Sequence, residues 1–130
     1  MTLTPAQARE QANAILASHY AGVSDWTEAT YDQAVAAIAA DGLPFSMNDV
    51  RAVLPDGQHH QAGLYFHSLS TRKNSPLVHV GYVKSINPKA HGKPVNLYRL
   101  TMQPAEFLHL RRTERAQRRQ GRTARREQAA

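Results

Sequence analysis

The sequence predicts a mainly α-helical domain that includes one β-hairpin. Three helix-start signals lie in the first 50 residues, and an apolar stripe at helical spacing follows between residues 62 and 69. Beyond residue 76 the apolar residues alternate with a period of two, in two stretches around a loop that contains proline and glycine. Helical spacing followed by alternation indicates several helices and then a two-stranded hairpin.

Length and composition are those of one domain. The chain has 130 residues, and 42% of them are hydrophobic, which is enough for a modest core. It contains no cysteine, so a disulfide scaffold and thiol catalysis are excluded. No apolar run is long enough to cross a membrane, and the N-terminus lacks a secretory signal pattern. We therefore expect a cytoplasmic protein with no membrane partner.

The first predicted helix begins with a capping box. Thr4 is the expected N-cap and Gln7 its partner, and the helix should run to about Tyr20. Two interpretations stay open: the helix packs on the chain's own core, or it pairs with a second copy in a homodimer. Both would use one face at helical spacing, made of Ala8, Ala12, Ile15 and Leu16.

Two further helices are predicted before residue 55. Asp25, with Glu28 three residues later, starts the second, and Asp41-Gly42 is its exit. Ser46 and Asp49 repeat the capping pattern for the third, which ends before Pro55 and has Phe45 as a hydrophobic staple. The apolar stripes are Val35, Ile38 and Ala39 in the second helix, and Met47, Val50, Val53 and Leu54 in the third.

A fourth helix is predicted over residues 58–72. The residues Ala62, Tyr65, Phe66 and Leu69 fall in one narrow sector, as expected of a stripe that faces the core. The opposite face is small and polar, and it holds His60, Leu64, His67 and Thr71 with Ser68 beside them. Arg72 and Lys73 close the helix, where cations suit its dipole.

The hairpin is predicted from two alternating stretches, 78–83 and 95–100. The loop between them runs from Asn87-Pro88 to Lys93-Pro94 and carries lysines and a histidine but no acid. Its basic side chains either touch a nucleic acid or belong to an ordinary solvated turn. Trp26, Tyr31 and Tyr98 are expected to pack in or around the core rather than to stack on bases.

The C-terminal segment begins at Pro104 as an amphipathic helix that uses Phe107 and Leu108. Residues 111–130 hold eight arginines and two glutamates, and their net charge of +6 equals that of the whole chain. Gly121 is expected to divide this tail, so one continuous helix to residue 130 is not predicted.

Charge is distributed unevenly along the chain. Residues 1–56 carry two basic and seven acidic side chains, a net −5, whereas residues 57–130 carry fourteen basic and three acidic ones, a net +11. Such a field steers polyanions toward the C-terminal half, and polynucleotides are the commonest polyanions in a cytoplasm.

A winged helix-turn-helix consists of three helices followed by a hairpin, with the second and third helices joined by a tight turn. The sequence predicts these elements in this order. The segments "PFSMNDVRAVLPD", "VGYVKSINPKAHGKPV" and "YRL", with Gly63 and Phe66 between the first two, resemble small winged-helix DNA-binding proteins of actinobacterial phages and prophages. The resemblance covers about residues 26–100, and "AHG" at Ala90-His91-Gly92 is its most specific part. It implies a support helix at 46–54, a recognition helix at 58–72 and a wing at 87–94, in a protein of a bacterial host cell. The chain would then comprise an N-terminal helix (1–22), a winged helix-turn-helix domain (23–102) and a basic C-terminal helix or tail (103–130).

This organisation names the residues expected to contact double-stranded DNA. Recognition-helix side chains would contact bases, and lysines and arginines would hold phosphates. The candidates are His60, Gln61, Leu64, His67, Ser68, Thr71, Arg72 and Lys73 in the helix; Lys84, Lys89, His91 and Lys93 in the wing; and Arg111, Arg112, Arg115, Arg118 and Arg119 in the tail.

Other interpretations of these residues remain. His60 and His67 lie about two helical turns apart, too far to share a metal ion, so no metal or cofactor is expected. No nucleophile with a paired base and no phosphate-binding loop occurs, so we expect no enzymatic activity. Leu64 would touch a thymine methyl group or a protein, and the tail would follow DNA, fold on RNA or stay solvated.

The expected function is that of a transcriptional or recombination accessory factor that occupies a DNA site. The alternatives are a protein-interaction module that uses Leu64 and the N-terminal helix to bind a host protein, and RNA binding through the tail.

Overall fold

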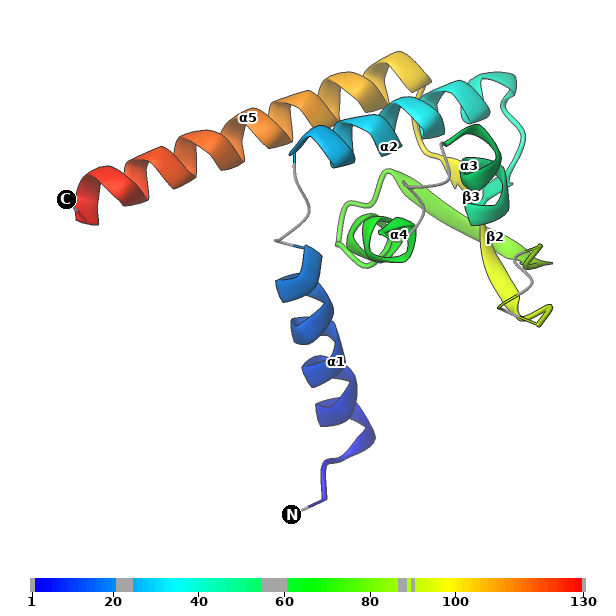
Figure 1. Ribbon diagram of the computed structural model, residues 1–130, viewed down its shortest axis with the longest axis horizontal. Helices are drawn as coiled ribbons and strands as arrows, with labels where there is room; N and C mark the ends of the chain where they lie inside the picture. The colour runs from blue at the N-terminus through cyan, green and yellow to red at the C-terminus, as the bar shows by residue number, and fades with distance from the viewer. Residues whose placement is uncertain (1, 21–24, 55–60, 87–88, 90, 130) are drawn as a thin grey trace.

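The computed structural model describes residues 2–20, 25–54, 61–86, 89 and 91–129, with the side chains of 16–20 left out. The chain is mainly helical, with one small antiparallel sheet (Figure 1). The long helix α5 lies along α2, and the hairpin and α1 project from the body in roughly the same direction. The helices and strands in order are α1 (Pro5–Tyr20), α2 (Asp25–Ile38), the 3-10 helix η1 (Ala39–Asp41), β1 (Phe45–Ser46), α3 (Met47–Val53), α4 (Ala62–Ser70), β2 (Leu77–Lys84), β3 (Pro94–Leu100) and α5 (Pro104–Ala129).

The predicted helix caps are confirmed. In α1, the Thr4 side chain accepts from the Gln7 amide at 3.1 Å and Gln7 accepts from the Thr4 amide at 3.0 Å. Ser46 and Asp49 form the same reciprocal box at α3. The exit from η1 uses Gly42 at φ +75°, a left-handed conformation that glycine adopts without strain.

One hydrophobic core joins α2, α3, α4, the sheet and the start of α5. The predicted stripe of α4 is confirmed, because its four members are all buried. Phe66 stacks on Tyr98 of β3 with 5.5 Å between ring centroids, and Tyr31 of α2 lies 5.1 Å from Tyr65. The helix α4 is thereby fixed between the sheet and α2. The largest apolar side chains that are completely buried include Tyr31, Val35, Phe45, Val50, Tyr65, Leu69 and Phe107.

The sheet has the strand order β1-β3-β2. The predicted hairpin is confirmed as β2 and β3, which pair from Leu77↔Leu100 to Lys84↔Pro94 with a bulge between His79 and Gly81. The two-residue strand β1, which places Phe45 opposite Tyr98, was not predicted. Asn48 of α3 fixes the start of the hairpin loop, since it donates to the Lys84 carbonyl at 2.8 Å and accepts from the Ile86 amide at 3.1 Å.

Several boundaries and burials differ from the prediction. The described part of the fourth helix begins at Ala62, after Gln61, and residues 58–60 lie outside the described residues. Its predicted tight connection to α3 also falls largely on undescribed residues, 55–60. Val53 is 56% exposed and Trp26 is 67% exposed, because neither points toward the core that their helices cover.

The expectation that Gly121 divides the tail is wrong. The helix α5 continues from Pro104 to Ala129 without a break. A single glycine costs about 1 kcal/mol relative to alanine. The strong helix formers around it and the docking of α5 on α2 outweigh that cost.

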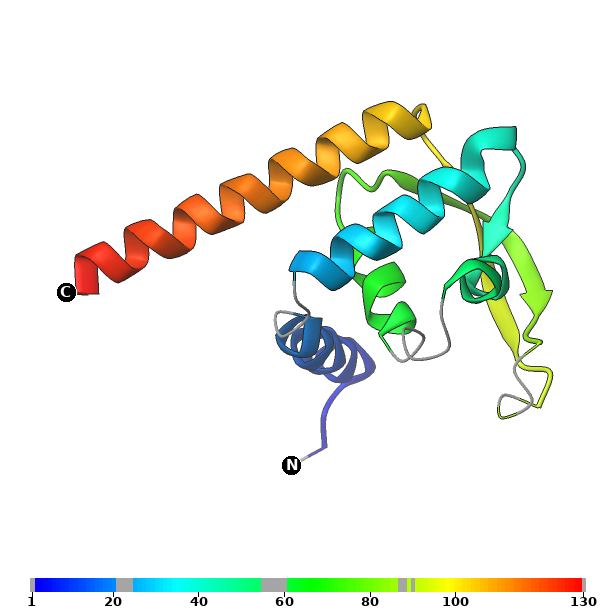
Figure 2. The same cartoon turned by 45° about the horizontal axis from the view of Figure 1, so that its top comes forward.

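For the described side chains, the expectation that the predicted face of α1 packs on the chain's own core is wrong. Ala8, Ala12 and Ile15 are exposed, and the Leu16 side chain lies outside the described part of the structure. The helix meets the body near α4 and then projects away from it (Figures 1 and 2). Pairing of this face with a second copy stays a prediction. Among the helices of the described ranges, none is long and apolar enough to span a membrane.

Candidate functional site

The arginines of α5 meet the acids of α2 in a largely buried ion-pair network. The two helices run antiparallel, so Asp25 at the start of α2 pairs with Arg122, and Asp32 further along pairs with Arg111 and Arg115. Glu28 lies between them and accepts from Arg111 at 3.0 Å, Arg115 at 3.3 Å and Arg118 at 2.6 Å. We call Asp25, Glu28, Asp32, Arg111, Arg115, Arg118 and Arg122 the α2–α5 network.

Asp32 is the most enclosed member of the network. Its carboxylate is fully buried and accepts from the Tyr65 hydroxyl at 2.5 Å, from Arg111 Nε at 3.0 Å and from Arg115. Burial raises the pKa of Asp32, while Arg111, Tyr65 and Arg115 oppose the rise by stabilising the carboxylate. Through Tyr65 the network also reaches α4, so it fixes three helices relative to one another.

This burial corrects part of the predicted site. Arg111 and Arg115 retain only 3% and 7% exposure, so they are not available to phosphates. Arg118 is partly exposed but already paired with Glu28. Arg112 and Arg119 are exposed, so their phosphate contact stays a prediction, and Arg119 lies 4.0 Å from Asp25. The first half of the tail is therefore structural.

The outward face of α4 is partly exposed, as the polar face was expected to be. Gln61, Leu64, His67 and Ser68 are half-buried and Thr71 is exposed, while His60 lies outside the described residues. The Thr71 hydroxyl donates to the His67 carbonyl at 2.7 Å, so it is already used as a donor. Leu64, His67 and Ser68 thus form the central part of this face.

The two cations at the end of α4 have different surroundings. Arg72 makes a bidentate ion pair with Glu114 of α5, with distances of 2.6 and 3.2 Å, and its Nε is buried without a partner in the described structure. Lys73 is exposed in the turn that follows. The prediction that Arg72 is a free phosphate contact is therefore not supported, because a carboxylate already holds its guanidinium.

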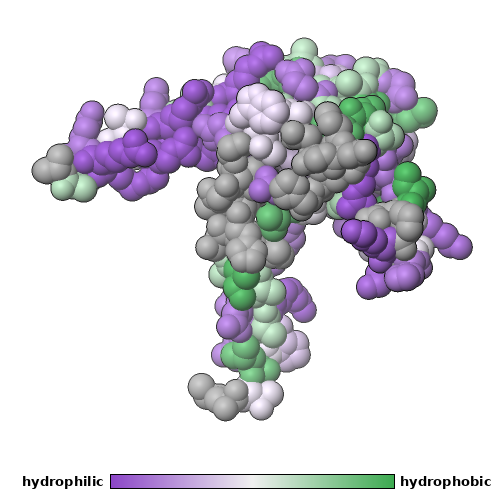
Figure 3. Space-filling model, viewed as in Figure 1, coloured by the Kyte–Doolittle hydropathy of each residue, from purple (hydrophilic) through white to green (hydrophobic). Residues whose placement is uncertain are grey.

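The hairpin end presents the expected basic side chains. Lys84, Lys89, His91 and Lys93 are all exposed. The Ser85 amide donates to the Lys93 carbonyl at 2.9 Å and closes the loop. His91 and Gly92 both have positive φ, 52° and 74°, so the chain turns sharply within the "AHG" motif. Figure 3 shows hydrophilic residues along α5 and at this end of the molecule.

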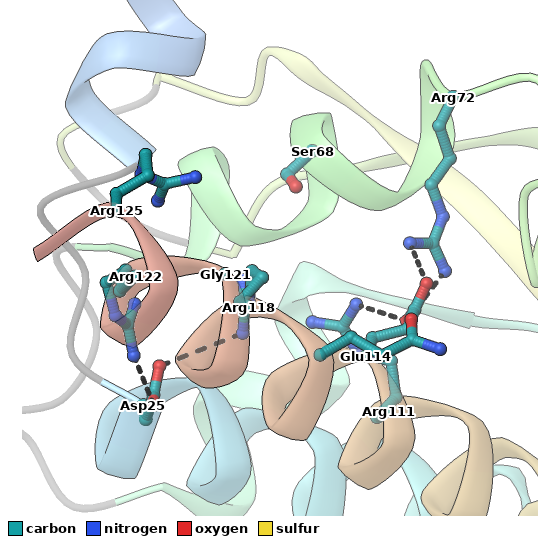
Figure 4. A pocket seen from close by; sticks show the side chains of 10 residues that line it. Asp25, Ser68, Arg72, Arg111, Glu114, Arg118, Gly121, Arg122 and Arg125 are labelled. Atoms are coloured by element: carbon teal, nitrogen blue, oxygen red, sulfur yellow. Dashed lines mark hydrogen bonds and ion pairs between the residues drawn. The ribbon is translucent and has the colours of Figure 1, made fainter. Parts of the chain in front are cut away.

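Two hollows flank the exposed face of α4. The smaller, of about 210 Å³, lies between α4 and the sheet and is lined by Gly63, His67, Ser70, Asn96 and Tyr98 among others. The larger, of about 630 Å³, lies between α4 and α5 (Figure 4). We call this larger space the α4–α5 hollow. Its lining includes Ser68 and Arg72 from α4, Asp25 from α2, and Glu114, Arg118, Arg122 and Arg125 from α5.

The α2–α5 network and the α4–α5 hollow were missed because they depend on contacts across about 40 to 100 residues of chain. A signal for them exists in the sequence. Acids at 25, 28 and 32 and arginines at 111, 115, 118 and 122 each repeat at three- and four-residue spacing, so each set forms one helical stripe. Two complementary stripes favour pairing with each other.

No group of three or more histidine and acidic side chains that could hold a metal ion occurs within the described segments. Comparisons with protein-family models, with curated proteins and with solved structures find no significant match to this chain.

Proposed function

We propose that this chain is a winged-helix protein that binds double-stranded DNA and acts by occupying a site, as a transcriptional or recombination accessory factor. The order α2-β1-α3-α4-β2-β3, with the first strand paired to the last, is compatible with that fold. In this scheme α3 is the support helix, α4 the recognition helix and the β2–β3 loop the wing.

The observation that carries the proposal is the position of the α4 face. It lies between the sheet of the basic hairpin on one side and the arginine-lined α4–α5 hollow on the other. Residues 57–105, which include α4 and the hairpin, hold six lysines and arginines and no acid. A duplex on α4 would therefore meet positive charge on both flanks, which suits phosphate backbones on the two sides of a groove.

The side chains of the α4 face suit base contacts of a limited kind. His67 and Ser68 can donate or accept hydrogen bonds at base edges, and Leu64 can touch a thymine methyl group. Each is half-buried, so little side-chain freedom would be lost on binding. The contribution of the hairpin would be phosphate contact through Lys84, Lys89 and Lys93.

The test compares the hairpin end with the rest of the same sheet. Fluorescence anisotropy with a random-sequence duplex should give binding that weakens steeply as salt rises. The double variant Lys84→Gln/Lys93→Gln should reduce the slope of log affinity against log salt by about two, roughly 0.9 per lost contact. Arg99→Gln is the matched control, since Arg99 is exposed at the opposite end of the hairpin, opposite Val78, and should leave the slope unchanged.

Two results would contradict the proposal. Wild-type chain that fails to bind duplex at low salt would remove it. Tighter binding to a single-stranded RNA of equal length would transfer the function to RNA, the alternative raised by the arginine-rich tail.

A second candidate, a protein-interaction module, is favoured by the apolar exposure of β2. This strand is at the edge of the sheet, where its outer backbone groups can pair with another chain. Val78, Val80, Tyr82 and Ile86 are between 43% and 69% exposed. This candidate requires neither duplex nor RNA binding, so the same anisotropy assay separates it from the first.

A further inference from the structure

The α4–α5 hollow combines a volume of about 630 Å³ with a lining that holds more basic than acidic side chains. Ligand pockets in proteins usually measure about 300–1,000 Å³. Five arginines and two acids line it, and Glu28 and Asp32 beneath the lining also pair with Arg111 or Arg118. Arg125 is the lining arginine that has no acidic partner in the described structure. Figure 4 shows Ser68 and Arg72 of α4 on one side of the space and the arginines of α5 on the other, with Arg122 turned toward Asp25 and Glu114 between Arg72 and Arg111.

The two acids are already occupied. Glu114 accepts from both Arg72 and Arg111, at 2.6 and 3.1 Å. Asp25 accepts from Arg122 at 3.2 Å and lies 3.8 Å from Arg118. They position the guanidinium groups but cannot neutralise all of them, so a surplus of positive charge remains in a space that α2, α4 and α5 enclose.

Three groups on the lining are left without partners inside the described structure. Arg125 makes no ion pair or hydrogen bond there, and its Nη1 lies 3.7 Å from where a side chain at Gly121 would begin, so the guanidinium folds back over the helix beside the hollow. Ser68 and Gln117 also line the space, and neither side chain makes a hydrogen bond within the described residues. Donors of this kind around surplus positive charge match the oxygen atoms of an anion.

We propose that the α4–α5 hollow is a phosphate-binding site in which Arg122 and Arg125 of α5 and Ser68 of α4 hold phosphate oxygens. Phosphate fits better than a carboxylate, because its several oxygens can accept from guanidinium forks on more than one side. The phosphate belongs either to the backbone of a duplex on α4 or to a free polyphosphate. The duplex source rests on the proposed function, since Ser68 lies on the same α4 face.

This site differs from the tail contacts expected from the sequence. Those involved Arg111, Arg112, Arg115, Arg118 and Arg119, of which the α2–α5 network holds Arg111, Arg115 and Arg118. Of the proposed ligands, Arg125 lies beyond the arginines that pair with α2, and Arg122 belongs to the α2–α5 network through the half-buried Asp25 alone. Both act together with a side chain of α4. The paired arginines beneath them form the base of the site.

The experiment titrates inorganic pyrophosphate into the full-length protein by isothermal titration calorimetry. Arg125→Gln should weaken pyrophosphate binding by about tenfold or more, as expected when one charge-assisted donor group is lost. Arg126→Gln is the matched control, because Arg126 has the same charge, is exposed on the same turn of α5 and does not line the hollow. It should change the affinity by less than about twofold. Circular dichroism of both variants checks that α5 stays folded.

A second arm measures duplex affinity against salt for the same proteins. If the duplex backbone fills the hollow, Arg125→Gln should lower the slope by about one and Arg126→Gln should not. Pyrophosphate binding that depends on Arg125 in a protein that binds no duplex would support a free-phosphate site and reject the proposed function. If the protein binds no pyrophosphate, or if Arg125→Gln and Arg126→Gln lose equal affinity for it, the phosphate site is overturned. Duplex binding that depends on Lys84 and Lys93 would still leave the proposed function intact.

Discussion

Replacing Arg115 by methionine should destabilise the fold strongly. Arg115 contacts both Glu28 and Asp32, and its side chain is only 9% exposed. Methionine keeps the aliphatic volume but removes the charge, so two buried carboxylates lose a shared partner. Breaking a buried pair from one side costs about 3–5 kcal/mol. Arg111 and Arg118 still serve Glu28, which favours the lower end, about 3 kcal/mol.

Urea unfolding followed by circular dichroism measures this cost. A loss of about 3 kcal/mol moves the midpoint by roughly 1–3 M for the usual range of slopes. Arg112→Met is the control, since Arg112 is exposed on the same helix and should cost no more than about 0.5 kcal/mol. Because the pair is buried, the loss should persist when salt is raised.

A double variant tests the mechanism. Asp32→Asn removes one of the two stranded charges, so combining it with Arg115→Met should cost less than the sum of the single changes, by about 0.5–3 kcal/mol. Equal costs for Arg115→Met and Arg112→Met would refute the docking of α5 on α2. Additive costs would refute the direct coupling of Arg115 to Asp32.

Three further predictions concern α5 and its docking on α2. Burial raises the pKa of Asp32 above its ordinary value of 3.8, so the folded chain keeps this proton at pH values where the unfolded chain has lost it. In urea unfolding at several pH values, wild type should therefore lose stability relative to Asp32→Asn as the pH rises above 3.8. The opposite trend would mean that the arginines dominate the pKa of Asp32. Deletion of residues 111–130 should abolish cooperative unfolding, whereas deletion of 123–130 should preserve it; folded protein after the longer deletion would show that the network is dispensable. Gly121→Ala should stabilise the chain by about 0.5–1 kcal/mol, since the added methyl group meets only Arg125 at an ordinary contact distance. Thermal unfolding measures the change. A lower melting temperature would indicate that the helix is interrupted at this residue.

The elements that were predictable are those with local signals. Thr4 with Gln7, and Ser46 with Asp49, are capping boxes within four residues of chain, and each forms as expected. The stripe of α4 and the alternation of the hairpin are likewise encoded over one or two turns or strands. Strand β1 has no comparable signal, because two residues are too few to establish a period of two. Its existence depends on Tyr98, 53 residues later, offering a partner for Phe45.

The fate of the tail could not be derived from charge counts. Eight arginines in residues 111–130 predict a solvated or DNA-bound segment when that segment is considered alone. In the folded chain, acids from residues 25–32 form ion pairs with several of these arginines, and α5 is docked on α2 as a result. The opposite charges of the two halves of the chain therefore partly attract each other within the fold, in addition to producing an electrostatic field around the molecule.

This pairing changes where the binding charge of the molecule resides. Counted by sequence, the tail accounts for the whole net charge. Counted after folding, Arg111 and Arg115 are neutralised inside, while the acid-free stretch 57–105 keeps its lysines on the surface around α4 and the hairpin. A polyanion would accordingly be drawn first to α4 and the hairpin, and the outer part of α5 would meet it only at the edge of α4. If this division holds, Lys84→Gln/Lys93→Gln should slow association with a duplex at low salt more than Arg112→Gln/Arg126→Gln, two changes of equal charge on the outward side of α5. Stopped-flow anisotropy measures both rates, and a larger effect from the α5 pair would return the main binding charge to the tail.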